Sequence, residues 1–222
     1  MRKQEQWLAG IYLVFQLLIL PVVLVLVNRL LPTPLNEARL NFVFFLLNFL
    51  IVVLICHRYL LDSLRAARRK GNRLLEAVVL MVPGYYMASM VIGAVIMYVM
   101  PTFFNVNDST IAGLASEDLP LTVIGTVILV PLAEETLYRG LIFGSLYRRN
   151  RVAAYVVSTL VFAAVHVVGY IGLYPPAQLL LCILQYLPAG ICLGWAYQHA
   201  GTLVAPIVIH TIINTLGILL VR

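Results

Sequence analysis

The chain has 222 residues, of which 62% are hydrophobic and 11% are charged, and its formal net charge is +6 at pH 7. A water-soluble domain of this length needs more polar surface, with about 25% charged residues being usual, so the composition excludes one and indicates an all-α polytopic membrane protein. The positive charge does not indicate a nucleic-acid partner, because the basic residues lie between the apolar runs rather than in a stripe with interleaved aromatic residues.

Seven apolar stretches follow one another along the chain, each near the roughly 20 residues that an α-helix needs to cross the hydrocarbon layer. Residues that break or cap helices, mainly proline, separate them. We therefore expect one membrane domain over residues 1–222, folded as a bundle of about seven transmembrane helices. The first stretch is too long for a signal peptide and no cleavage site follows it, so we expect a retained helix. The stretches cover residues 7–28, 39–57, 76–100, 120–146, 152–170, 177–198 and 203–221.

The charges of the loops predict the orientation of the bundle, because loops rich in Lys and Arg stay on the cytoplasmic side. Residues 57–76 contain five arginines and one lysine, and residues 147–151 contain three arginines. Residues 101–119 contain three acidic residues and no basic one. We therefore expect the N-terminus and the two basic loops to be cytoplasmic and the acidic loop to lie outside, with the plasma membrane as the location. The segment from Leu64 to Leu75 fits either a topology anchor or a short basic helix on the inner leaflet.

The fourth stretch contains three ionisable residues, Glu134, Glu135 and Arg139, in a helix that is otherwise apolar. Each such residue near the centre of a membrane helix costs about 2.5–3.5 kcal/mol before it finds a partner. Glu135 and Arg139 are four residues apart, with the acid on the N-terminal side, which favours a helical ion pair. Glu134 lies about 100° away around the helix, so we expect it to find its partner on another helix. Unless the three residues only pin helix packing, they mark a functional site.

Polar residues also interrupt the fifth and seventh stretches. His166 lies in the fifth, and His210 and Asn214 lie one helical turn apart in the seventh, hence on the same face. Taken alone, either histidine is more typical of a hydrogen-bonded packing residue than of a catalytic one. Counted from the cytoplasmic ends of the stretches, however, these residues and Glu134 fall within roughly one to two helical turns of one depth. The sequence therefore predicts that they can share one polar site.

Gly140 and Gly144 form a pair of small residues four apart in the fourth stretch. Such a pair lets a neighbouring helix approach closely. We expect both glycines to serve helix packing near the polar residues.

Three motifs on three separate stretches resemble, in this order, the pattern of the type II CAAX prenyl endopeptidase family. That family is also called CPBP, for CAAX protease and bacteriocin-processing enzymes. The resemblance covers about residues 120–220, and it identifies residues 119–222 as the expected catalytic core. Residues 1–118 are expected to supply N-terminal helices and the basic cytoplasmic loop. The motifs are Glu134-Glu135-x-x-x-Arg139, Phe162-x-x-x-His166 and His210-x-x-x-Asn214.

The resemblance implies an intramembrane endopeptidase of the glutamate type that needs no metal. In such an enzyme Glu134, assisted by His166, activates a water molecule for attack on the scissile carbonyl. His210 and Asn214 then stabilise the oxyanion, the ion pair on the fourth stretch supports the site, and Phe162 packs beside it. The implied partners are the membrane lipids and a peptide or protein substrate, with lipidated and membrane-anchored chains among the candidates.

Two other functions stay open on the sequence. In a zinc-dependent metalloprotease, Glu134, His166 and His210 bind Zn²⁺ while Glu135 acts as the base. The chain has no H-E-x-x-H pair, however, and this arrangement leaves Asn214 without a role. In a non-catalytic protein, such as a bacteriocin-immunity or scaffold protein, the polar residues only hold helices together. A proton-coupled transporter is disfavoured, because the stretches show no inverted repeat.

Overall fold

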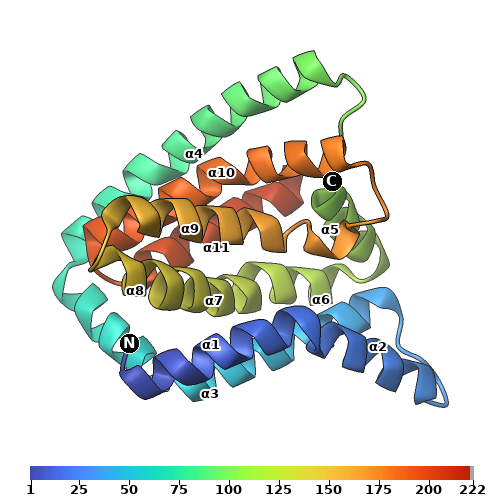
Figure 1. The fold of residues 1–222 in the computed structure, drawn as a ribbon, viewed down its shortest axis with the longest axis horizontal. Helices are drawn as coiled ribbons and strands as arrows, with labels where there is room; N and C mark the ends of the chain where they lie inside the picture. Colours follow the sequence, from blue (N-terminus) through green and yellow to red (C-terminus); the bar gives the residue numbers. More distant parts are fainter. Residues whose placement is uncertain (221–222) are drawn as a thin grey trace.

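The computed structural model describes residues 1–220, and within that range the chain is a bundle of helices without a strand. Most of the long helices run side by side, and α4 (Gly71–Val99) crosses them at an angle (Figure 1), which agrees with the predicted all-α membrane bundle. The first half of the chain forms α1 (Lys3–Leu18), α2 (Leu20–Leu30), α3 (Glu37–Arg69), α4 (Gly71–Val99) and α5 (Val106–Glu117). The second half forms α6 (Leu119–Val123), η1 (Ile124–Leu129), α7 (Val130–Glu135), η2 (Thr136–Phe143), α8 (Gly144–Tyr147), α9 (Arg151–Val165), η3 (Val168–Tyr170), α10 (Pro176–Ala200) and α11 (Val204–Leu220).

Within residues 1–220, four helical segments are long and apolar enough to cross a membrane, or five if the bent pair α1 and α2 counts as one span. The four are α3, α4, the continuous run from Leu119 to Tyr147, and α10. α9 has 15 residues and α11 has 17, fewer than the roughly 20 needed for a full crossing. Each of the seven predicted stretches contains a helix, but the predicted count of seven spans is approximate.

The first predicted helix, residues 7–28, is two helices that meet at Ile19 and are bent by 51°. Pro21 explains the break. Its ring clashes with the carbonyl of Leu17, four residues earlier, and it has no N–H to donate to that carbonyl. The prediction of one continuous helix is therefore wrong here, and α2 turns away from the rest of the bundle (Figure 1).

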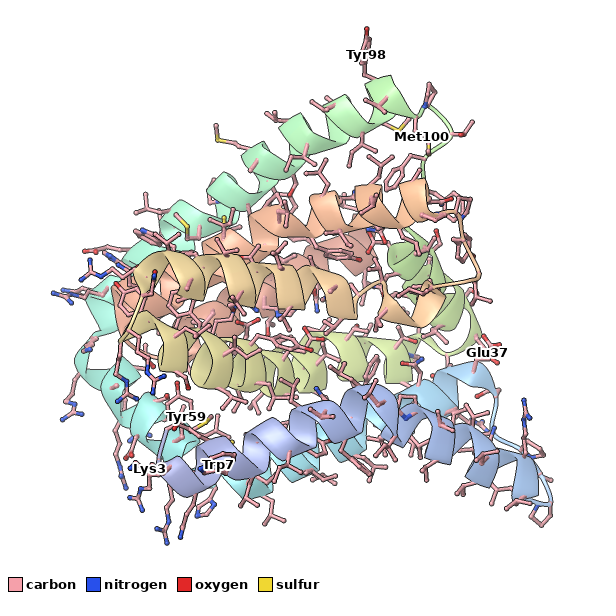
Figure 2. The ribbon with its side chains drawn as sticks, in the orientation of Figure 1. Lys3, Trp7, Glu37, Tyr59, Tyr98 and Met100 are labelled. Carbon is pink, nitrogen blue, oxygen red and sulfur yellow. The ribbon has the colours of Figure 1, made fainter. Side chains whose placement is uncertain are left out.

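The basic loop contains no separate helix. α3 continues to Arg69 and α4 begins at Gly71, so Lys70 alone lies between them. The alternative of a separate surface helix from Leu64 to Leu75 is therefore wrong, because the arginines, alanines and leucines of this segment are good helix formers that extend the two long helices. Nitrogen-bearing side chains gather at this end of the bundle, where Lys3 also lies (Figure 2).

The fourth span departs from a regular α-helix as it approaches the polar residues. η1 is a π-helix, in which the N–H of Val130 donates to the carbonyl of Gly125, five residues earlier. In this register the carbonyl of Thr126 would accept from residue 131, but Pro131 has no N–H to donate. The Thr126 carbonyl is therefore free to accept a side chain from a neighbouring helix.

The end of the bundle opposite the basic segments contains a helix that was not expected (Figure 1). Residues 101–119, predicted as a loop, contain α5. The side chain of Asn105 caps this helix by accepting from the N–H groups of Asn107 and Asp108. α5 lies at the same end of the bundle as the C-terminal end of α11 (Figure 1).

The fifth stretch ends as a helix earlier than predicted. The sequence indicated a helix to residue 170, but α9 ends at Val165 and His166 is its C-terminal cap residue. Nδ1 of His166 lies 2.7 Å from the carbonyl oxygen of Phe162, an acceptor that the next helical turn would otherwise use. The histidine therefore lies at the open end of a helix rather than inside a span.

Candidate active site

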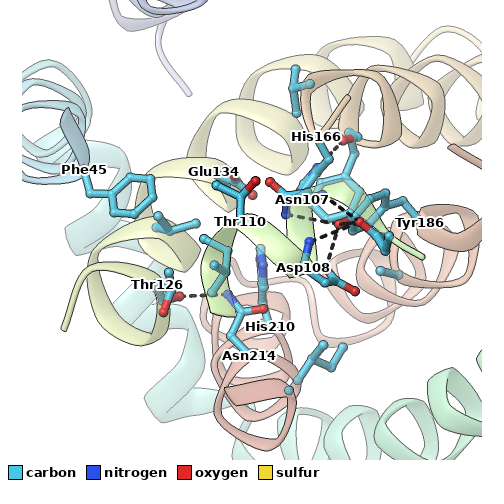
Figure 3. Close-up of a pocket in the computed structure, with 18 of the residues that line it drawn as sticks. Phe45, Asn107, Asp108, Thr110, Thr126, Glu134, His166, Tyr186, His210 and Asn214 are labelled. Carbon is cyan, nitrogen blue, oxygen red and sulfur yellow. Dashed lines mark hydrogen bonds between the residues drawn. The ribbon is translucent and has the colours of Figure 1, made fainter. Parts of the chain in front are cut away.

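A cavity of about 680 Å³ lies between the helices, and four of the predicted site residues line it. Glu134 comes from α7, His166 from the end of α9, and His210 and Asn214 from α11. Figure 3 shows these side chains around one pocket. The structure thus brings together the four residues that the sequence predicts at a shared polar site.

Glu134 has a carboxylate oxygen without a protein partner. Its Oε2 atom is buried, and within residues 1–220 it accepts no hydrogen bond. The expectation that Glu134 finds a partner on another helix is therefore wrong. The reason is that the histidine of α11 binds the neighbouring Glu135 instead. A buried carboxylate oxygen without a donor is unfavourable, so this group gains from any donor that enters the cavity.

Glu135 is fully buried and accepts from two donors with the same oxygen. Its Oε1 lies 2.9 Å from Nη1 of Arg139 and 2.8 Å from Nδ1 of His210. The Glu135 and Arg139 side chains are both 0% exposed, so the predicted ion pair is present and shielded from water. The Glu135 carboxylate also fixes the ring of His210. Since Nδ1 of His210 carries its proton toward Glu135, Nε2 is the nitrogen left for the cavity.

Phe162 packs among the charged and imidazole groups. The guanidinium carbon of Arg139 lies 4.4 Å from the centre of the Phe162 ring, which is a cation–π contact. The ring centres of His166 and His210 lie 4.7 Å and 5.8 Å from it. Phe162 therefore covers the buried charge and spaces the two histidines.

His166 is held by a backbone carbonyl and by an aromatic ring. A carbonyl only accepts, so the nitrogen that faces the Phe162 oxygen, Nδ1, carries a proton. The imidazole stacks on Tyr186 of α10, with ring centres 4.3 Å apart and planes 28° apart. Nε2 is therefore the free nitrogen of His166, as it is in His210.

Asn214 binds the carbonyl that the π-helix leaves free. Its Nδ2 donates to the Thr126 oxygen at 2.8 Å, and Oγ1 of Thr211 donates to the Val127 oxygen at 3.1 Å. These two bonds join α11 to η1, so Pro131 in the fourth span indirectly sets the place of Asn214. The amide keeps one N–H and its own oxygen for the cavity.

Gly140 and Gly144 allow neighbouring helices to approach the fourth span. A Cβ at Gly140 would lie 2.7 Å from the ring of Tyr59 on α3, and one at Gly144 would lie 3.1 Å from the hydroxyl of Tyr197 on α10. The two tyrosine hydroxyls are 2.9 Å apart. Both glycines thus serve close packing beside the site.

The sequence did not reveal the polar groups that α5 and α10 contribute. Asn107, Asp108 and Tyr186 all line the cavity. In the sequence Asp108 indicates only an outward-facing loop, although the polar run that begins at Asn105 is typical of a helix start. The surrounding protein raises the pKa of the Asp108 carboxyl above its usual value by excluding water, and the hydrogen bond from Tyr186 opposes that rise.

A zinc site needs several metal-binding side chains around one point. Among the described residues, no group of three or more His, Cys, Asp or Glu side chains is arranged to hold a metal ion. The zinc alternative also needs Glu135 as a base, whereas Glu135 binds Arg139 and His210 and does not line the cavity. Glu135 is therefore not placed for that role, although another carboxylate, that of Asp108, lines the cavity.

These features define an integral membrane protein of helices with a polar site enclosed between them. Residues 116–216 match the family described as type II CAAX prenyl endopeptidase Rce1-like. This stretch contains all three motifs, from Glu134 to Asn214. The family resemblance that the motifs indicate is confirmed over these residues.

A curated protein of Lactococcus lactis subsp. lactis, UPF0177 protein YxdF, is 32% identical to this chain over 90 residues. The matched segment makes up 40% of this chain and 44% of that relative, so it spans less than half of either protein. No solved structure matches the chain. The family match therefore describes the part of the molecule that carries the three motifs.

Proposed function

We propose that the protein is an intramembrane endopeptidase in which Glu134 activates a water molecule. One observation carries the proposal, namely the buried, unpartnered Oε2 of Glu134 in a cavity that it shares with His166, His210 and Asn214. A water molecule bound between the carboxylate and an imidazole would satisfy that oxygen and stand ready for attack. The match to a family of prenyl endopeptidases supports the same chemistry.

In the proposed reaction the water oxygen attacks the carbonyl carbon of the substrate, and one water proton passes to Glu134. Nε2 of His166 accepts a hydrogen bond from the water and orients it. The C–N bond of the tetrahedral intermediate then breaks, and the proton on Glu134 moves to the leaving amine. The products are a carboxylic acid and an amine, and Glu134 is a carboxylate again.

His210 and Asn214 are the proposed donors to the oxyanion. Nδ1–H of His210 is committed to Glu135, so Nε2 donates only when the ring carries its second proton. The carboxylate of Glu135 at 2.8 Å favours that form, and the guanidinium of Arg139 on the same oxygen opposes it. Asn214 supplies its remaining N–H. Loss of one oxyanion donor lowers the rate of comparable enzymes by about 10²–10³-fold.

The proposed reaction needs no metal and acts on a peptide or protein substrate, with lipidated or membrane-anchored chains as candidates. Within residues 1–220, no group of three or more metal-binding side chains lies together, which supports a reaction without a metal. The position of the cavity between apolar helices supports a substrate that reaches it from the membrane. We further propose that the protein lies in the plasma membrane with its basic ends in the cytoplasm, because both basic segments lie at the same end of the bundle (Figure 2).

The decisive test compares purified wild type with Glu134→Gln in detergent. Both are incubated with a peptide library, and fragments are identified by mass spectrometry. Glu76→Gln is the matched control, because Glu76 pairs with His199 at 2.9 Å and does not line the cavity. Wild type and Glu76→Gln are expected to produce the same fragments, and Glu134→Gln none. Identical fragments from Glu134→Gln would remove the catalytic assignment.

Chelation tests the metal-independent reaction. Activity is expected to survive exhaustive treatment with a chelator, and the purified protein is expected to contain no stoichiometric zinc. Activity that is lost on chelation and restored by zinc would favour the metalloprotease instead.

A further inference from the structure

The first turn of α5 and the hydroxyl of Tyr186 form a hydrogen-bonded group at the cavity (Figure 3). Nδ2 of Asn107 donates to the Tyr186 oxygen at 3.1 Å. The Tyr186 hydroxyl lies 2.9 Å from Oδ1 of Asp108 and 3.2 Å from Oδ1 of Asn105. A hydroxyl has one proton to donate, and the shorter bond to a charged acceptor is the stronger one. Asp108 is therefore the main acceptor of the Tyr186 proton.

The ring of Tyr186 lies in turn against His166, with centroids 4.3 Å apart. Phe162 contacts the imidazole at 4.7 Å, and its carbonyl binds Nδ1. The imidazole is thus held by two aromatic rings and one hydrogen bond. A displaced Tyr186 ring would remove the stacking contact, so the bond from Tyr186 to Asp108 helps to fix His166.

Asp108 also carries the charge that suits a positive imidazole. His166 is among the groups that lower the pKa of the Asp108 carboxyl, against the larger effect of water exclusion, which raises it. Asp108 lines the main cavity and a second one of about 350 Å³ between α4 and α5, so part of its accessible surface faces these cavities. His166 itself caps the C-terminal end of α9, where the helix dipole favours a cation.

We propose that Asp108, acting through Tyr186, is a positioning residue for His166 in the hydrolysis proposed above, on which this inference rests. Asp108 and Tyr186 together hold the imidazole of His166 with Nε2 toward the cavity. Asp108 also favours the partial positive charge that the imidazole develops while Nε2 of His166 accepts the hydrogen bond of the attacking water. Asp108 keeps its negative charge when Glu134 has taken up the proton of the water.

The other titratable groups that surround His166 do not replace Asp108 in this role. Glu134 becomes neutral during the proposed reaction, and a protonated His210 has the same sign of charge as the imidazole. The tyrosines of the cavity are neutral at ordinary pH. Besides Tyr186 on α10, these tyrosines are Tyr138 on η2, Tyr170 on η3, and Tyr85 and Tyr86 on α4.

The rival explanation is that Asp108 only docks α5 on the bundle, and Glu117 supplies a matched control for it. Oε2 of Glu117, at the end of α5, accepts from the N–H of Ala38 on α3 at 2.8 Å, and neither residue lines the cavity. Glu117→Ala therefore removes an acidic contact of α5 but leaves the stack of Tyr186 on His166 untouched.

Steady-state kinetics of four full-length variants test the inference. Asp108→Asn and Tyr186→Phe are each expected to lower kcat about tenfold and to leave KM within about twofold of the wild-type value. A tenfold fall in kcat corresponds to the loss of one charge-assisted hydrogen bond. The kcat of the double variant is expected to be no lower than that of the less active single variant, because both substitutions break the same hydrogen bond between Tyr186 and Asp108. Glu117→Ala should stay within about twofold of wild type. An equal loss in Glu117→Ala, or an effect of Asp108→Asn confined to KM, would overturn the inference.

A histidine NMR spectrum needs no activity and so separates this inference from the proposed function. The chain has four histidines, and His166→Gln assigns the signal of interest. The stacked Tyr186 ring shields the ring protons of His166, so their signal is expected to move downfield in Asp108→Asn and to stay in place in Glu117→Ala. An unmoved signal in Asp108→Asn overturns the inference even where wild type cleaves peptides. A moved signal in a protein that cleaves nothing supports the positioning of His166 by Asp108 and removes the protease proposal.

Discussion

Oε1 of Glu135 lies 2.8 Å from Nδ1 of His210, so a glutamate of the fourth span holds a histidine of α11 in place. The same oxygen also accepts from Arg139 at 2.9 Å. The adjacent Glu134 has a buried oxygen that accepts no hydrogen bond within residues 1–220. The two neighbouring glutamates therefore differ in their contacts: Glu135 binds two partners through Oε1, whereas Glu134 lines the cavity.

Glu134→Gln is expected to abolish proteolysis without weakening the fold. The amide cannot take the proton from water, so activity should fall by at least about 100-fold. Stability should stay equal or rise, because the change removes an unpaired buried charge. Thermal unfolding in detergent and the fragment assay measure the two effects. A large loss of stability would mean that Glu134 has a structural partner.

Glu135→Gln is expected to destabilise the protein, in contrast to Glu134→Gln. It leaves the buried guanidinium of Arg139 without a counter-charge, and breaking such a pair costs about 3–5 kcal/mol. The measurement is the free energy of unfolding in detergent.

The double variant Glu135→Leu with Arg139→Met is the control for that loss. It replaces the ion pair by apolar groups and should recover most of the stability. Activity should stay low in the double variant, because His210 still lacks its acceptor. Full activity in it would show that the ion pair does not position the site.

Asn214→Ala and Thr211→Val form a matched pair. Both residues donate to carbonyls of η1, so each change is expected to cost about 0.5–1.5 kcal/mol of stability. Asn214 alone of the two lines the cavity. Activity should therefore fall by about 10²–10³-fold in Asn214→Ala and stay close to wild type in Thr211→Val. Equal activity losses would show that the contact with η1, and not the amide in the cavity, matters.

The stability of the protein should depend on pH through Asp108. Its folded pKa is raised, so the folded protein holds this proton more tightly than the unfolded chain does. The contribution of Asp108 to stability is therefore highest below the unfolded pKa of about 4, and it declines as the pH rises from there to the raised folded value. The difference in melting temperature between wild type and Asp108→Asn should follow that decline. A difference that grows more favourable to wild type over the same interval would contradict the assignment.

Local features of the chain were predictable from the sequence. The hydropathy of each stretch indicates a membrane helix, because in lipid every backbone group must be satisfied within its own segment. The pair Glu135 and Arg139 was predictable because a spacing of four residues brings both side chains to one face of a helix. The break at Ile19 follows from Pro21, a local cause that a count of apolar residues overlooks.

The partner of each polar group was decided only by the tertiary structure. Whether His210 meets Glu134 or Glu135 depends on how α11 and α7 are rotated against each other, and rotation results from packing across the whole bundle. The place of Asn214 depends on a carbonyl freed by a π-helix, and that of Asp108 on a loop segment that folds back as α5. The sequence by itself thus determined which polar and ionisable residues lie inside apolar helices. Contacts between distant segments determined which of them bind a partner and which, like Glu134, have a buried atom without one in the described part of the chain.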